Sequence, residues 1–375
     1  MNLKTITERT DLYDTYVIVR SSCNIPLKDG KPRNLFRLLR ALPTLEYLRA
    51  QGAKTIVISH IGRKPEETLY PVYEAVSERL PVTWGGDVTS PEFDLIHKGM
   101  APGEIVICEN LRQYEAEEAN DDAFAATIAA YGQVYVNDGF AEAHRAHAST
   151  VGVARRLPAY AGITLAQEVA ELGKAMTPER PALFLLGGAK FETKMPLVEK
   201  YLTSYDSVFI GGALLHDLMK ARGLEIGQSL VSDVSLAGAS FLDSAKIVWP
   251  IDVVVDAGDG AHTVRPLTGV LPTDRIMDAG PETVALLSNE ITNAKTVLWN
   301  GPFGNYEAGF VEATEATAKA MAAASAFSIV GGGDTVAAIE KLGLNDDFGF
   351  ISIGGGAMLE YLEKGTTEAL ELLRA

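Results

Sequence analysis

The sequence predicts an α/β protein with parallel sheets that is divided into two domains. Short β-branched runs alternate with helical patterns along the whole chain, which is typical of parallel sheets covered by helices. The 375 residues exceed what one hydrophobic core usually holds, so two domains are expected. In the second half, apolar runs repeatedly end in glycine clusters, which predicts free backbone N–H groups at one sheet edge.

The composition argues against several classes of protein. Hydrophobic residues make up 47% of the chain, as in ordinary globular proteins. The net charge of −16 argues against nonspecific nucleic-acid binding, although a local basic cleft could still bind an anionic substrate. Cys23 and Cys108 lie far apart, so a reducing cytoplasm is expected rather than a disulfide framework. The polar Met1–Asp11 segment and the absence of a long apolar run predict neither a leader nor a membrane span.

Four strands and two helices are predicted in the first half. The helices are Leu35–Ala50, with an expected kink at Pro43, and Asp121–Tyr131, capped by Asn120 or Asp121. The strands are Tyr16–Arg20, Thr55–Ser59, Glu104–Cys108 and Gln133–Asn137.

Basic residues lie at or just beyond the ends of these four strands. They are Arg20, His60, Arg63, Arg112, His144 and Arg145, which Arg37 of the first helix could join. Ligands of open α/β sheets bind beyond the carboxyl ends of the strands, and guanidinium groups suit phosphates and carboxylates. One such arginine is more often an ordinary surface residue, but the same pattern at four strand ends favours an anion site. No histidine or cysteine spacing resembles a metal site, and His97, His216 and His262 are expected to be structural.

A connecting helix and a second set of strands follow. A domain boundary is expected near residues 157–163, and the amphipathic stretch Thr164–Met176 is a candidate connector. Helices are predicted over Val336–Leu342, Ala357–Glu363 and the tail Thr366–Leu373. The strands are Ala182–Leu186, Val208–Ile210, Val297–Trp299, Phe327–Val330 and Phe350–Ile353, with a further run near Ile247–Val255.

The glycine clusters of the second half are candidate phosphate sites. Lys190 and Lys194 would share a face if helical, which is unfavourable unless an anion lies between them. Asp334 follows three glycines and could cap its helix or hold Mg²⁺ on a nucleotide. The triplet Gly354–Gly356 also opens a helix, which is costly unless a ligand approaches the backbone closely. Neither a P-loop nor a dinucleotide fingerprint is present, so a dehydrogenase is disfavoured.

The chain resembles the phosphoglycerate kinase family essentially from end to end. Eight ordered segments carry the resemblance: Arg20–Leu27, Ser59–Arg63, Glu109–Arg112, Asp138–Ser149, Gly187–Lys194, Trp299–Glu307, Gly331–Thr335 and Ser352–Ala357. The resemblance implies two Rossmann-like domains joined by a helical hinge. Residues 1–160 would bind phosphoglycerate, 161–178 would form the hinge, 179–356 would bind the nucleotide, and 357–375 would return toward the first domain.

The resemblance also implies an activity and its residues. The reaction is reversible phosphoryl transfer between ATP and the carboxylate of 3-phosphoglycerate, with Mg²⁺, in a cytoplasmic monomer without nucleic-acid or membrane partners. The catalytic residues would be Arg37, Lys190 and Lys194, and Asp334 would hold the metal. The phosphoglycerate ligands would be Ser22, Asn24, Arg37, His60, Arg63, Arg112 and Arg145. The nucleotide ligands would be Lys190, Lys194, Gly211, Gly212, Asn300, Pro302, Glu307, Gly333, Asp334, Thr335, Gly354, Gly355 and Gly356.

The chain departs from the family pattern at a few positions. Ser22 replaces an aspartate that helps to hold the sugar acid, although its hydroxyl can still form a hydrogen bond to the substrate. Ile353 replaces a threonine, and Thr193 an aspartate. Gly139, Ala141 and Glu142 depart from the usual Ala-Phe-Gly-Thr pattern. Two alternatives therefore stay open: a non-catalytic nucleotide-binding relative, and a kinase for a different small carboxylate.

Overall fold

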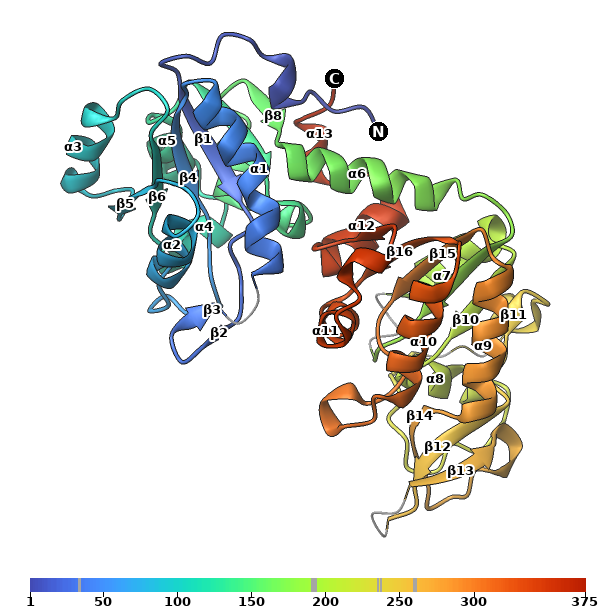
Figure 1. The fold of residues 1–375 in the computed structure, drawn as a ribbon. Coiled ribbons are helices and arrows are strands. Elements are labelled where there is room, and N and C mark those ends of the chain that lie inside the picture. The colour runs from blue at the N-terminus through green and yellow to red at the C-terminus, as the bar shows by residue number, and fades with distance from the viewer. Residues whose placement is uncertain (33–34, 190–193, 235, 237, 259–261) are drawn as a thin grey trace. The chain divides into compact units, whose positions relative to one another are not determined.

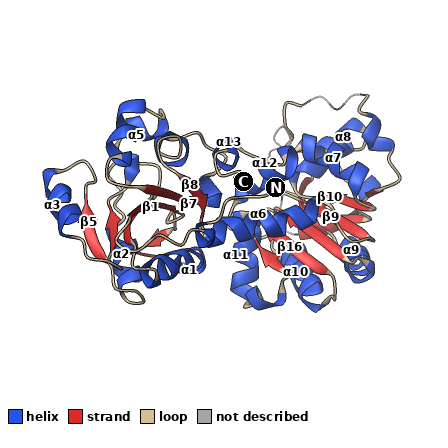
Figure 2. Ribbon diagram, turned by 90° about the horizontal axis from the view of Figure 1, so that it is seen from above, coloured by secondary structure: helices blue, strands red, loops and turns tan. Residues whose placement is uncertain are grey.

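The computed structural model describes residues 1–32, 35–189, 194–234, 236, 238–258 and 262–375. The chain divides into two compact units, one formed by Met1–Ala170 with Lys364–Ala375 and the other by Glu171–Glu363. Each unit contains a six-stranded sheet with helices on both of its faces (Figure 1, Figure 2). Helix α6 (Ile163–Met176) contains the division between the units. This architecture confirms the predicted α/β class with parallel sheets.

The sheet of the first unit has the strand order β5-β6-β4-β1-β7-β8, and every neighbouring pair is parallel. The strands are β1 (Tyr16–Ser21), β4 (Lys54–Ile58), β5 (Thr83–Gly86), β6 (Ile105–Cys108), β7 (Val134–Asp138) and β8 (Ala159–Ala161). The four predicted strands are present with ends within one residue of expectation, whereas β5 and β8 carry too weak a pattern to be predicted.

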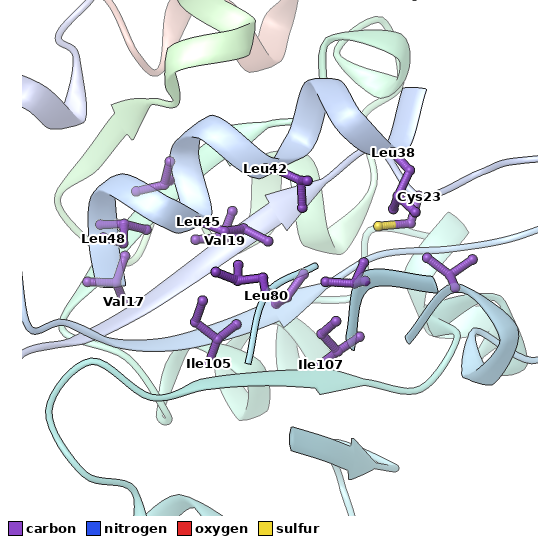
Figure 3. Close-up of a cluster of buried hydrophobic side chains, with 14 of the residues drawn as sticks. Val17, Val19, Cys23, Leu38, Leu42, Leu45, Leu48, Leu80, Ile105 and Ile107 are labelled. Atoms are coloured by element: carbon purple, nitrogen blue, oxygen red, sulfur yellow. The ribbon is translucent and has the colours of Figure 1, made fainter. Parts of the chain in front are cut away.

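Successive residues of the central strands pack into two different cores. Val17 and Val19 join the core beneath helix α1 (Phe36–Ala50), whereas Ile18 joins the core on the opposite face. Figure 3 shows the first of these cores, in which leucines of α1 lie against β1 and β6. Strands that are buried on both faces read as continuous apolar runs, which is why they could be recognised in the sequence.

The two helices predicted in the first half are present as α1 and α5, whereas α2, α3 and α4 were not predicted. Helix α1 is continuous through Pro43, and Asp121 caps α5 by accepting the backbone N–H of Phe124 at 2.8 Å. Leu3 and Arg374 form an isolated antiparallel bridge, so the two termini lie side by side (Figure 1). The other elements are β2 (Leu27–Lys28), β3 (Lys31–Pro32), α2 (Tyr70–Ser77), α3 (Pro91–Gly99), α4 (Glu115–Glu118), α5 (Asp122–Ala129) and α13 (Glu368–Glu371).

The main sheet of the second unit has the order β11-β10-β9-β15-β16-β17 and is also parallel. Its strands are β9 (Ala182–Leu186), β10 (Ser207–Ile210), β11 (Ile247–Val248), β15 (Thr296–Asn300), β16 (Phe327–Gly331) and β17 (Phe350–Ile351). Its helices are α7 (Met195–Ser204), α8 (Ala213–Ala221), α9 (Pro281–Asn293), α10 (Glu312–Ala323), α11 (Gly333–Leu342) and α12 (Gly355–Lys364).

Two expectations for the second half are wrong in detail. The run near Ile247–Val255 divides into β11 and β12 (Asp252–Asp256), which belong to different sheets and are separated at Pro250, a residue without an N–H donor. Strand β12 pairs with β13 (His262–Pro266) and β14 (Arg275–Ala279) in an antiparallel sheet that the sequence did not predict. The tail predicted as Thr366–Leu373 is helical only over Glu368–Glu371. None of the described helices is long and apolar enough to cross a membrane.

Candidate active site

The carboxyl ends of the strands in the first unit meet at one edge of its sheet because all pairings are parallel. Arg20 is the penultimate residue of β1, His60 follows β4, Arg112 follows β6, and Arg145 follows β7. The positive charges of Arg20, Arg112 and Arg145 all act on His60. The structure therefore brings these predicted residues to a common edge.

Arg20 is fully buried, and hydrogen bonds fix its guanidinium group. Its Nε donates to Ser149 Oγ at 3.0 Å, and Nη2 lies 2.9 Å from His60 Nδ1. Its Nη1 donates to the Ser21 carbonyl and lies 3.7 Å from the Glu142 carboxylate. A buried cation is tolerated only with such partners, so the position of this charge is closely defined.

His60 is a neutral hydrogen-bond donor at this edge. Arginine can only donate, so Nδ1 of His60 accepts from Arg20 and the ring proton lies on Nε2. Burial and the neighbouring positive charges lower the pKa of His60 to about 2, which keeps the ring uncharged at neutral pH. Nε2 has no hydrogen-bond partner within the described residues. This buried N–H group is available to an anionic ligand.

The loop after β1 contributes two more of the predicted residues. The Ser22 hydroxyl donates to Glu142 Oε2 at 2.7 Å, and both side chains are buried. Asn24 Oδ1 accepts the backbone N–H of Gly62 at 3.0 Å, which fastens this loop to the segment after β4. The Asn24 carbonyl accepts from Arg37 Nη1 of α1 at 3.3 Å. Hydrogen bonds thus connect Ser22 to the segment after β7, and Asn24 to Arg37 and to the segment after β4.

The remaining predicted arginines differ in their surroundings. Arg112 forms an ion pair with Glu118. Arg63 and Arg145 are exposed, and Arg145 Nε lies 3.3 Å from His144 Nε2. Exposed guanidinium groups pay no burial cost and can approach a phosphate or carboxylate directly.

Glycines let the backbones approach closely at the strand ends of the second unit. The Gly187 N–H donates to the Asn300 carbonyl at 2.8 Å, and the Gly188 N–H to the Pro302 carbonyl at 3.0 Å. A Cβ atom at position 187 would lie 2.2 Å from the Pro302 carbonyl oxygen. Gly212 has a φ of +63°, which side chains disfavour. These positions therefore require glycine for steric reasons.

A cavity of about 330 Å³ lies in the second unit beside these glycines. Its wall includes Gly211, Gly212, Pro302, Glu307 and Asp334, all of which the family resemblance assigns to the nucleotide. The other predicted residues Asn300, Gly333, Thr335 and Gly354–Gly356 lie outside its wall. The volume and the mixed apolar and polar wall suit a small organic ligand.

Several polar residues of the cavity wall are missing from the sequence-based prediction, among them His216 and Asp278. His216, which was expected to be structural, lies in α8 with Nδ1 2.7 Å from the Leu230 carbonyl. Asp278 lies in β14, and burial raises the pKa of its carboxyl group to about 7. Neither residue follows a strand of the main sheet, which was the signal that identified the other candidates.

Lys194 stands at the start of α7, next to the first glycine cluster. Its Nζ donates to the Gly187 carbonyl at 2.5 Å. Burial lowers the pKa of Lys194 to about 8, and the negative charge of Asp334 partly opposes this effect. Lys190 and Thr193 lie outside the described residues.

Two helices at the strand-end edge of this sheet have glycine as their first residue. Helix α11 starts at Gly333 after β16, and α12 starts at Gly355 after β17. A Cβ atom at either glycine would meet nothing within 4 Å, so the space at both helix starts is open. Thr335 Oγ1 is buried without a hydrogen-bond partner in the described part of the chain. Open helix N-termini with free donors are suited to phosphate groups.

Comparisons with known proteins agree with this arrangement. The family model described as phosphoglycerate kinase matches residues 7–365. A phosphoglycerate kinase of Moorella thermoacetica is 41% identical over 371 residues, which cover 94% of each chain. The solved structure of phosphoglycerate kinase from Coxiella burnetii is 34% identical with a TM-score of 0.85, and the match covers 99% of this chain and 98% of that one. The crystal structure of the enzyme from Pyrococcus horikoshii is 29% identical with a TM-score of 0.86 over the same shares of the two chains. The chain belongs to the phosphoglycerate kinase family.

Proposed function

We propose that this protein transfers a phosphoryl group reversibly between ATP and the carboxylate of 3-phosphoglycerate, giving ADP and 1,3-bisphosphoglycerate. Its family membership supports this kinase activity and its place in glycolysis. The observation that carries the proposal is that each unit has, at the strand-end edge of its sheet, groups suited to binding an anion. The first has fixed cationic and N–H donors for a small phosphorylated acid. The second has a cavity, a lysine and open helix N-termini for a nucleotide.

The first unit is assigned to the sugar acid. His60 Nε2 and the exposed Arg63 and Arg145 would hold its phosphate or carboxylate, with Arg112 nearby. Ser22 and Asn24 would position it, and Arg37 would reach both the substrate and the transferring phosphoryl group. These roles fit the chemistry of charge-assisted hydrogen bonds between guanidinium groups and oxyanions.

The second unit is assigned to the nucleotide. Gly211, Gly212, Pro302 and Glu307 would bind the nucleoside in the cavity whose wall they form. Lys194 would contact the phosphates, as Lys190 would by family resemblance. The phosphates would also meet the starts of α11 and α12, with Thr335 and Gly354–Gly356, near Asn300.

Mg²⁺ fits this second site as a partner of the nucleotide. Asp334 is exposed at the start of α11 and forms part of the cavity wall, so its carboxylate could take part in binding the ion. Among the described residues no cluster of three or more metal-ligating side chains exists, and Mg²⁺ bound with ATP needs only one or two carboxylates beside the phosphates. When bound, the ion would neutralise charge that develops on the phosphate oxygens.

The reaction requires little acid–base chemistry from the protein. The acceptor carboxylate is already ionised, so positioning and charge stabilisation carry most of the catalysis. Transfer requires both substrates to meet, so we extend the proposal to a hinge at residues 161–178, since α6 belongs partly to each unit. A monomeric state and a cytoplasmic location are part of the same proposal.

The test is turnover of MgATP with 3-phosphoglycerate, coupled to a dehydrogenase that consumes 1,3-bisphosphoglycerate. Arg37→Ala should lower kcat by roughly 100- to 1,000-fold, the usual effect of removing one transition-state donor. Arg79→Ala is the matched control, because Arg79 follows α2 and bonds mainly to the carbonyl of Ala75. ATP binding without turnover would favour the non-catalytic relative, and turnover only with another carboxylate would favour the alternative acceptor.

A further inference from the structure

A buried serine, glutamate and arginine form a connected group at the strand-end edge of the first unit. Ser22 Oγ donates to Glu142 Oε2 at 2.7 Å, and Arg20 Nη1 lies 3.7 Å from the same oxygen. Ser22 and Glu142 are each 3% exposed, and Arg20 is 0% exposed. Glu142 therefore carries a buried negative charge that compensates Arg20 and accepts the only proton of the Ser22 hydroxyl.

The sheet register explains why residues so far apart in sequence meet here. Strands β1 and β7 are parallel neighbours, with Arg20 opposite Asn137 and Ser21 opposite Asp138. The residues that follow the two strands are therefore adjacent. Ser22 comes directly after β1, and Glu142 ends a short 3₁₀ turn that begins just after β7.

Gly139 provides the room for the glutamate. A Cβ atom at position 139 would lie 3.1 Å from Glu142 Oε2, which is tighter than most Cβ contacts, and 3.4 Å from Arg20 Nη1. Gly139, Ser22 and Glu142 are also three of the positions at which the chain departs from the family pattern of Ala, Asp and Thr. Direct contacts join these three departures, so they form one packed set rather than scattered differences.

We propose that Glu142 is a positioning residue for the sugar acid: it supplies the carboxylate that position 22 lacks, and by taking the Ser22 proton it leaves the lone pairs of that hydroxyl for the substrate. A hydroxyl group has one proton and two lone pairs. Because its proton points to Glu142, Ser22 can only accept from a ligand. It therefore favours a substrate that donates from a hydroxyl group, such as the one next to the carboxylate of 3-phosphoglycerate. This inference rests on the proposed function.

The test is a double-mutant cycle read on 3-phosphoglycerate binding by calorimetry. Glu142→Thr and Ser22→Asp should each raise Kd by about tenfold or more, the first by freeing the Ser22 proton and the second by placing two carboxylates together. The double variant should return to within about threefold of the wild type, because one carboxylate is restored. The KM for MgATP should stay within about twofold throughout, since the nucleotide is assigned to the other unit.

Two controls separate positioning from a general loss of structure. Phosphorylated 3-hydroxypropanoate lacks the hydroxyl group next to the carboxylate, so the wild type and Glu142→Thr should bind it equally. Glu117→Gln removes another buried carboxylate near Arg20 that bonds to Ser149 instead of Ser22, and should leave Kd within about twofold. If Glu142→Thr does not fold, Glu142→Gln takes its place, because it removes the charge with little change in volume.

The outcomes distinguish this inference from the proposed function. Unchanged Kd in the Glu142 variants, additive losses in the double variant, or equal weakening of both ligands would overturn the inference and leave the kinase activity untouched. A wild type that binds 3-phosphoglycerate without turnover would refute the function, while the cycle would still decide the role of Glu142. A wild type that does not bind it at all would refute both.

Discussion

Replacing Lys194 with methionine should make the protein more stable and much less active. The substitution keeps the length of the side chain and removes its charge. In the folded protein this charge is partly buried, which lowers the pKa of Lys194 from 10.5 to about 8. Its one hydrogen bond in the described residues goes to the Gly187 carbonyl. The same lysine is assigned to the nucleotide phosphates, so stability and activity should change in opposite directions.

The size of the pKa shift determines how much the free energy of unfolding should change. One pKa unit corresponds to about 1.4 kcal/mol, so the shift from 10.5 to about 8 represents ~3 kcal/mol of unfavourable free energy at neutral pH. The side chain remains partly exposed, and the lost hydrogen bond to Gly187 offsets about 1 kcal/mol. The free energy of unfolding should therefore rise by about 1–2 kcal/mol in Lys194→Met, while kcat falls by at least about 100-fold.

Urea unfolding at several pH values, together with the coupled turnover assay, checks this prediction. A lysine whose pKa is lowered by folding costs most below pH 8, and wild-type stability recovers as the pH rises toward 10.5. The advantage of Lys194→Met should shrink over that interval. Lys220→Met, in the last turn of α8, is a control for the removal of an exposed lysine and should change stability by less than about 0.5 kcal/mol. A less stable Lys194→Met, or one with nearly normal turnover, would refute the reasoning.

Three further predictions follow from the packing and ionisation of other residues. Gly187→Ala should lower the free energy of unfolding by about 3 kcal/mol or more, because its Cβ atom would lie 2.2 Å from the Pro302 carbonyl oxygen. Gly173→Ala in α6, where a Cβ atom meets nothing within 4 Å, should instead raise it by about 0.5–1 kcal/mol, and equal effects in urea unfolding would contradict both statements. Burial raises the pKa of Asp138 to about 7, so wild-type stability should fall by up to ~4 kcal/mol between pH 4 and pH 7. Asp138→Asn should flatten this pH dependence, and an unchanged slope would show that another group causes it. Gly139→Ala should cost about 1 kcal/mol of unfolding free energy in the wild type but little in Glu142→Thr, so equal costs in thermal unfolding would argue against contact between these positions.

The sequence predicts the parallel strands well because each is buried on both faces. The run Ala182–Leu186 reads as a strand without help from any neighbour, and the structure has β9 over those residues. Strand β13 could not be found in the same way. Its residues His262–Pro266 alternate between exposed and partly buried positions and contain no apolar run. Strand β5, with the sequence Thr-Trp-Gly-Gly, is short and ends in two glycines, which are depleted in strands, so it is defined by its pairing with β6.

The cationic edge of the first unit could be predicted for a topological reason. Parallel strands end on the same side of a sheet, so basic residues that follow them share one edge. They come close here because β6, β4, β1 and β7 are consecutive neighbours in the sheet. The contact between Ser22 and Glu142 could not be predicted in this way. It spans 120 positions and depends on β1 lying next to β7 in one particular register. Neither could the tautomer of His60, which depends on the direction of the Arg20 side chain.

The two strand-end edges differ in the groups that they offer to an anion and in how buried charge is compensated. In the first unit the buried positive charge of Arg20 is already balanced by Glu142, and His60 stays neutral, so accessible arginines remain as the net positive groups. In the second unit open helix N-termini supply N–H donors, and Lys194 carries the cost of a buried charge. Backbone donors need no compensating carboxylate, which explains why glycine marks the second edge in the sequence and charged side chains mark the first. Adding a positive charge to the first edge would therefore disturb the charge balance between Arg20 and Glu142. Removing Lys194 would instead remove a buried charge that Asp334 offsets only in part.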